Sequence, residues 1–128
     1  MAGEITITPN ITLRNSRLRH QYSPGKIVID QSTARVYSQV YTIGTSEESI
    51  TSWGDIETPG VMQLLNLDAT NYVEWGPATG SYIGHLTAND GSSTTGLPWA
   101  IWYGHSTTDL YLKADTAACD VLVTVYDR

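Results

Sequence analysis

The sequence predicts an all-β fold, an antiparallel β-sandwich of jelly-roll-like type with about ten short strands. Two observations lead to this prediction. No window of about a dozen residues keeps apolar side chains at the i, i+3, i+4 and i+7 spacing of an amphipathic helix. Instead, short runs of β-branched and aromatic residues recur between turn clusters such as Pro24-Gly25 and Pro59-Gly60. The chain has 128 residues, which is enough to bury a core of its own.

The predicted strands follow one another at near-regular spacing. Two short strands, 4–8 and 11–14, precede a basic segment, and a third, 26–30, follows the Pro24-Gly25 turn. The remaining predicted strands are 34–44, 48–53, 61–67, 72–75, 81–86, 99–104, 109–114 and 120–127.

Alternation is clearest in the last two strands. In the final one, valines share one face at positions Val121, Val123 and Val125, and the other face holds Leu122, Thr124 and Tyr126. In the strand before it, the core-facing residues are expected to be Leu110, Leu112 and Ala114. The short Ala117-Ala118 turn predicts that these two strands form a hairpin.

Charge divides the chain into two parts. Residues 1–35 contain five cations against two acids, or +3, whereas residues 36–128 contain two cations against eleven acids, or −9. We therefore expect residues 1–25 to form an N-terminal strand pair with a basic arm, and residues 26–128 to form the sandwich, within one domain overall. The arm, residues 15–25, is either a solvated loop or a contact arm for an acidic partner. The predicted contact residues are Arg14, Arg17, Arg19 and Lys26.

The stretch NLDATNYVEWG, residues 66–76, has four oxygen-bearing side chains, those of Asn66, Asp68, Asn71 and Glu74. A calcium loop of the EF-hand type needs a Gly at its sixth position and a Glu at its twelfth, and neither is present. Asp at the start of a turn accepts backbone N–H bonds, and Asn tolerates a left-handed backbone. The pattern therefore predicts a hairpin corner between strands 61–67 and 72–75, and no metal site.

No catalytic, cofactor-binding or metal-ligating residue is predicted elsewhere. His20, His85 and His105 are far apart in the sequence and fit no metal-binding spacing. Ser106 lacks the G-x-S-x-G context of a nucleophile elbow. Cys119 is interpreted as a small buried hydrophobe. The glycine spacing at Gly76, Gly80 and Gly84 is interpreted as turns and bulges.

The chain contains no Phe, so Trp and Tyr must supply the aromatic part of the core. We expect Trp75 and Trp99 to be core residues because they occupy strand positions. Exposed rings among Trp53, Trp75, Trp99 and Trp102 would instead favour a carbohydrate-binding module.

Two segments, GDIETPGVMQLLNLDATNYVEWGPATGSYIGHL and TDLYLKADTAACDVLVTVYD, resemble small β-sandwich virion proteins of tailed bacteriophages. The resemblance covers residues 54–86 and 108–127 and implies a structural virion protein, best matched by a capsid decoration or cement protein. Tail or connector roles are the alternative. The implied partners are the major capsid protein and further copies of this chain, and no enzymatic activity is implied. The net charge of −6 argues against nucleic acid, and no apolar run is long enough for a membrane span.

Overall fold

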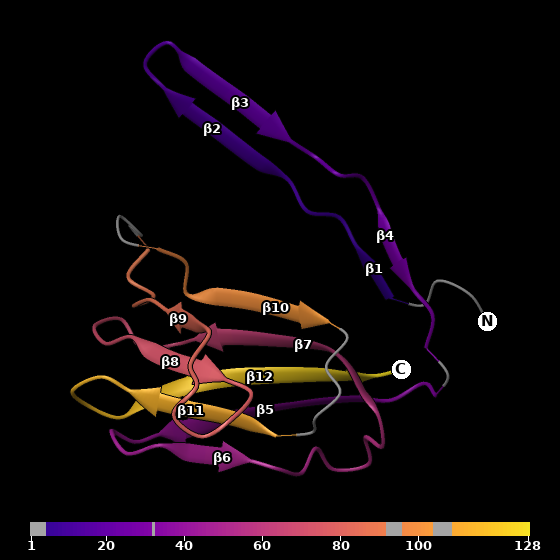
Figure 1. Cartoon of the computed structure of the whole chain (residues 1–128), viewed down its shortest axis with the longest axis vertical. Helices are drawn as coiled ribbons and strands as arrows, with labels where there is room; N and C mark the ends of the chain where they lie inside the picture. Colours follow the sequence, from indigo (N-terminus) through magenta and orange to yellow (C-terminus); the bar gives the residue numbers. More distant parts are fainter. Residues whose placement is uncertain (1–4, 32, 92–95, 104–108) are drawn as a thin grey trace. The chain divides into compact units, whose positions relative to one another are not determined.

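The computed structural model describes residues 5–31, 33–91, 96–103 and 109–128, and it is all-β as predicted (Figure 1). The chain divides into two compact units, Met1–Thr33 and Ala34–Arg128. The boundary therefore lies at Thr33, not after residue 25. The described residues include no helix with the length and apolar character that crossing a membrane requires.

The second unit, which we call the body, is a sandwich of two four-stranded antiparallel sheets. One sheet has the order β10-β7-β12-β5 and the other has the order β6-β11-β8-β9. The strands are β5 (Val36–Ile43), β6 (Glu48–Ile50), β7 (Pro59–Asn66), β8 (Val73–Gly76), β9 (Gly84–Leu86), β10 (Trp99–Tyr103), β11 (Leu110–Ala114) and β12 (Cys119–Asp127).

The pairing of these strands is nested, which confirms the jelly-roll prediction. The first strand of the body pairs with the last, β5 with β12. The second pairs with the second last, β6 with β11. The two inner pairs are β7 with β10 and β8 with β9. Such an arrangement is one long antiparallel ribbon wrapped into two facing sheets.

The core lies between the two sheets and follows the predicted alternation. Both predicted inward-facing sets are buried, with every member at 1% exposure or less: Leu110, Leu112, Ala114, Val121, Val123 and Val125. Trp53 and Trp75 are core residues as well. The prediction for Trp99 was wrong, because its side chain is 43% exposed. Trp99 pairs with Leu65 on the outer face of the sheet, while its neighbours Ala100 and Trp102 pack against the core.

Two predicted hairpins are wrong for the same reason. Strands β7 and β8, and likewise β11 and β12, belong to different sheets. The connecting residues 67–72 and 115–118 therefore cross from one sheet to the other. Both members of each pair bury alternate side chains in the same core, so consecutive strands face each other across it instead of sharing a ladder.

The first unit is a β-ribbon of two antiparallel pairs. Strand β1 (Ile5–Ile7) pairs with β4 (Ile27–Ile29), and β2 (Ile11–Asn15) pairs with β3 (Leu18–Tyr22). The segment 15–25, which was predicted to be a loop or an extended arm, thus contains a strand of its own. The segment 26–30 was assigned to the sandwich, but its strand pairs with the N-terminal strand.

A buried amide anchors the corner between β7 and β8. The Asn66 side chain is fully buried, and its Nδ2 donates to the carbonyl oxygens of Asn71, Leu86 and Thr87 at 2.9, 3.3 and 3.0 Å. Its Oδ1 accepts the backbone N–H of Asp68 at 2.9 Å. One side chain therefore bonds backbone groups of the 67–72 connection and of the C-terminal end of β9.

Replacing Asn66 by Ala should destabilise the body by about 2–4 kcal/mol, because buried backbone groups lose their partners. Urea unfolding measured by circular dichroism tests this. The exposed Thr70→Ala at the same corner is the control and should change the free energy of unfolding by less than about 0.5 kcal/mol. Equal effects of the two substitutions would contradict the anchoring role of Asn66.

Candidate interaction surface on the arm ribbon

The segment β2–turn–β3, residues 11–22, is called the arm ribbon below. Asn15 and Leu18 are cross-strand partners, so Ser16 and Arg17 form a two-residue turn. Ser16 has a φ of 50°, a backbone conformation that L-residues with a side chain rarely adopt. A positive φ at the first turn position is typical of a type II′ hairpin turn, whose twist matches that of the flanking strands.

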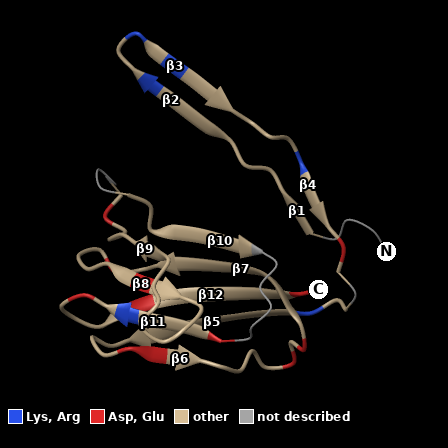
Figure 2. Ribbon diagram, viewed as in Figure 1, with Lys and Arg blue, Asp and Glu red and all other residues tan. Residues whose placement is uncertain are grey.

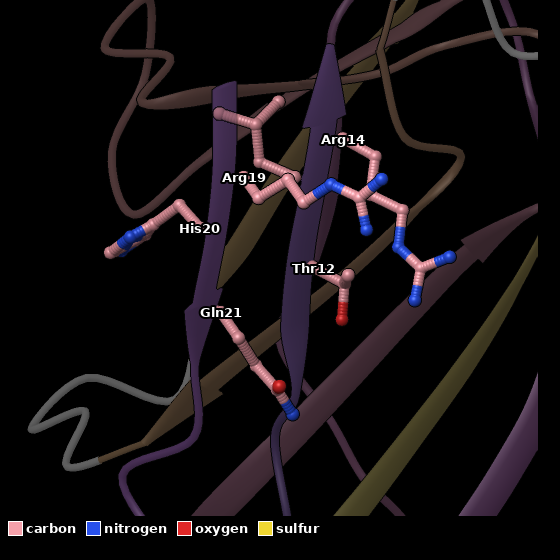
Figure 3. A pocket seen from close by; sticks show the side chains of 6 residues that line it. Thr12, Arg14, Arg19, His20 and Gln21 are labelled. Carbon is pink, nitrogen blue, oxygen red and sulfur yellow. The ribbon is translucent and has the colours of Figure 1, made fainter. Parts of the chain in front are cut away.

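The register gives the arm ribbon two chemically different faces, because residues directly opposite each other share a face. One face is mostly apolar and contains Ile11, Leu13, Asn15, Leu18, His20 and Tyr22. The other face is polar and basic and contains Thr12, Arg14, Arg19 and Gln21. Figure 3 shows the polar group together on one side of the ribbon and His20 on the other.

The basic face is built around two arginines. Arg14 and Arg19 are direct cross-strand partners, and they help to line a shallow hollow of about 280 Å³. Like charges directly opposite each other destabilise a strand pair. No acidic residue occurs between positions 11 and 22 to offset them, and Figure 2 shows only positive charge on this part of the ribbon. The pair is therefore suited to an anionic group such as a carboxylate, which a guanidinium binds through two parallel hydrogen bonds.

The structure brings together three of the four predicted contact residues. Arg14 and Arg19 share the basic face, and Arg17 lies in the turn between their strands. Lys26 lies just before β4, in the other half of the unit. It follows Arg19 by seven residues, roughly 23 Å of extended chain. Lys26 is thus separate from the arginine cluster.

The apolar face of the arm ribbon is exposed along its whole length. Every residue of β2 and β3 is exposed, including Ile11 at 63% and Leu18 at 59%. An isolated two-stranded hairpin is marginally stable in water unless its apolar face packs against something. Exposed apolar residues beside an arginine pair have the composition of a protein-binding surface.

The sequence contained a signal for the second strand that the prediction of a loop or arm over residues 15–25 did not use. Polar and apolar residues alternate in ITLR, which was predicted as a strand, and again in LRHQY, which was not. Alternation with a period of two is the mark of a half-buried strand. The charged residues of this segment favoured the prediction of a solvated loop or arm over that of a strand.

The side-chain oxygens of the stretch 66–76 bond to other groups of the body instead of standing free. Asp68 Oδ1 accepts the backbone N–H groups of Thr70 and Asn71 at 2.8 and 2.6 Å, which confirms its predicted role as a turn former. Glu74 pairs with His85 at 3.4 Å, and the imidazole stacks on the ring of Tyr72. Within the described ranges, no group of three or more His, Cys, Asp and Glu side chains is placed to hold a metal ion.

The other residues considered in the sequence analysis have structural roles wherever the structure describes them. Cys119 is buried, and burial raises the pKa of its thiol to about 11. A side chain on Gly76 would collide with the Ser81 carbonyl, and one on Gly84 would collide with the Trp75 ring. Close packing therefore explains both glycines, while Gly80 has the positive φ of a turn residue. His105 and Ser106 lie outside the described residues.

Comparison with known proteins gives no match to any family model, curated protein or solved structure. The resemblance to phage virion proteins therefore stays a prediction from the sequence.

The pKa of Asp68 is lowered from its ordinary value of 3.8, first by the Asn71 N–H and then by the Thr70 N–H. A lowered folded-state pKa adds stability above the unfolded pKa, and this stability is lost as the pH falls through the folded value. Asp68→Asn should therefore destabilise the body at pH 7, and its difference from wild type should shrink below about pH 3.8.

Urea midpoints measured between pH 2 and pH 7 test this expectation. The control is Thr70→Ala, which keeps the Asp68 carboxylate and both backbone N–H groups and should give a curve parallel to that of the wild type. A constant difference between Asp68→Asn and wild type over the whole pH range would contradict the assigned hydrogen bonds.

Proposed function

We propose that this chain is a structural virion protein of a tailed bacteriophage, a capsid decoration or cement protein that attaches through the arm ribbon. The observation behind the proposal is the arm ribbon itself, with an uncovered apolar face opposite a pair of facing arginines. Both features are costly in the free chain and become favourable when a partner covers the apolar face and supplies carboxylates. A ribbon with these two faces is therefore suited to attaching the chain to a partner.

The charge distribution over the two units supports the same function. The first unit has four cations against two acids, or +2, and the body has three cations against eleven acids, or −8. An acidic shell would attract the first unit and repel the body, so the chain would bind in one orientation. A fixed orientation is what a protein that decorates a repeating surface needs.

The architecture of the body agrees with a virion role by analogy. Double-sheet jelly rolls are common in viral capsid domains and in lectins, although a fold by itself assigns no function. The proposed partners are the major capsid protein and further copies of this chain, in the virion. A tail or connector position would use the same ribbon chemistry, and a density map of the purified particle separates these positions.

Replacing Arg14 and Arg19 together by Ala should weaken binding to capsids that lack this chain by roughly 10- to 100-fold, since charge-assisted hydrogen bonds are lost. Binding of the variant should also depend less on salt between about 50 and 200 mM. Sedimentation of capsids with labelled protein gives the occupancy. The matched control is Lys113→Ala, an exposed cation of the body, which should leave occupancy unchanged. Wild-type occupancy with both arginines removed would rule out attachment through the basic face.

One observation favours a second function, carbohydrate binding. Trp99 is 43% exposed, and its Nε1 donates to Gln63 Oε1 at 3.2 Å on the outer face of its sheet. An exposed indole beside an amide is a combination suited to stacking on a sugar ring and bonding its hydroxyls.

If the body binds a glycan there, Trp99→Ala should abolish a response on a glycan array while leaving the thermal unfolding midpoint within a few degrees of wild type. Trp75→Ala should unfold the body instead, because Trp75 is a core residue. A wild-type protein that binds no glycan on the array would remove this second function.

A further inference from the structure

The free edge of strand β5 differs from the other three sheet edges of the body. β5 is the outermost strand of its sheet, and among the described residues only β12 pairs with it (Figure 1). It is eight residues long, whereas the edge strands β10, β6 and β9 have five, three and three. A long edge strand presents a row of backbone N–H and C=O groups that another strand can pair with.

This edge has none of the features that normally block such pairing. The sequence VYSQVYTI, Val36–Ile43, contains no charged residue and no proline. Its register with β12 runs through eight consecutive residue pairs without a shift, so no bulge turns it aside. Natural proteins protect edges with charges, prolines, bulges or short strands. Its outward-facing valines are exposed as well, Val36 at 62% and Val40 at 47%.

The sequence of β5 is complementary to itself when it is run antiparallel. With Gln39 on a twofold axis, the pairs are Tyr37 with Tyr41, Ser38 with Val40, and Val36 with Thr42. Each aromatic side chain then meets an aromatic one, the outer-face positions meet small or β-branched residues, and Gln39 meets its own copy. Aromatic and β-branched cross-strand pairs stabilise sheets, and a twofold interface requires this reciprocal pattern.

Electrostatics also favour a second copy at this edge. The chain has a net charge of −6, so two copies repel each other over most surfaces. The centre of the sheet face beside the edge is uncharged, because Leu122 pairs with Val40 and Thr124 pairs with Ser38. The one acid in this ladder, Asp120, lies toward its end, where it pairs with Thr42 and accepts the Thr42 hydroxyl at 2.7 Å. The Ser38 and Thr124 hydroxyls bond each other at 3.0 Å. Two copies can therefore approach around Gln39 without bringing like charges together at the axis.

We propose that β5 pairs antiparallel with β5 of a second copy about a twofold axis at Gln39, which joins two four-stranded sheets into one continuous sheet of eight strands. This dimer would supply the contact between copies that the proposed function includes, and in that respect the inference rests on the proposed function. The edge and the arm ribbon share no residue, so substitutions can test each of them separately.

The first test is the mass of the full-length chain by sedimentation equilibrium at about 100 μM. We expect the wild type at twice its 14.0 kDa, and Val40→Lys at the monomer mass, because a lysine at an edge blocks strand pairing. The matched control is Val28→Lys, which changes a valine of similar exposure, 45%, in the first unit. It should remain a dimer. Circular dichroism verifies that each variant is folded.

The second test needs no charged substitution. Gln39→Cys should be joined to a covalent dimer by a short bifunctional maleimide, because the two thiols flank the axis. Ala78→Cys, at an exposed turn of the other sheet, should not be joined. Cys119 is buried in both proteins and serves as a shared background.

The proposal would be overturned by a monomeric wild type or by a dimer that persists in Val40→Lys. It would also be overturned if Val28→Lys lost the dimer as well, or if position 39 gave no cross-linking. All of these measurements use the free protein. Failure here therefore leaves capsid binding through the arginines unaffected, and failure of capsid binding leaves the dimer unaffected.

Discussion

The body depends on the double pairing of strand β12. This strand lies between β5 and β7, the first and third strands of the body, and bonds to both. Its inward-facing valines, including Val121 and Val125, have no exposed surface. The pairing also joins the two ends of the unit, since Asp127 donates its N–H to the carbonyl of Arg35 at 3.1 Å. Because these contacts join residues distant in sequence, the body must close long loops before its core is complete, which slows folding.

A second constraint follows from the nested strand order. Consecutive strands such as β7 and β8 lie in opposite sheets, so each connection must turn the chain around the rim of the core. At one such rim, Asn66 and Asp68 supply the hydrogen bonds that water would otherwise provide to the turning backbone. The cluster of oxygens in this segment therefore has a structural cause. The oxygens of Asn66 and Asp68 accept neighbouring backbone N–H groups, and Asn71 Oδ1 accepts the Thr116 hydroxyl.

The sequence was sufficient for the fold class and for the inward faces of β11 and β12, because alternation depends on the side chains of one strand alone. It was not sufficient for the partners of those strands, since a valine such as Val123 is buried equally well by either neighbour. Trp99 was misplaced because its assignment depended on which face of β10 met the core. The arginines of the candidate site were identified by their charge, but the opposition of Arg14 and Arg19 follows from a register that the Ser16-Arg17 turn sets.

The facing arginines have a consequence for when the arm ribbon becomes ordered. Their mutual repulsion acts while no anion is near, and the exposed Leu13 and Leu18 add no compensating burial. The two strands should then separate and re-form rapidly in the unattached chain. A segment that fluctuates in this way samples a larger volume than a rigid one and can make first contact from further away. If the chain attaches through the arm ribbon as proposed, ordering of the ribbon would be the last step of attachment, and amide exchange in the ribbon would distinguish bound chains from free ones.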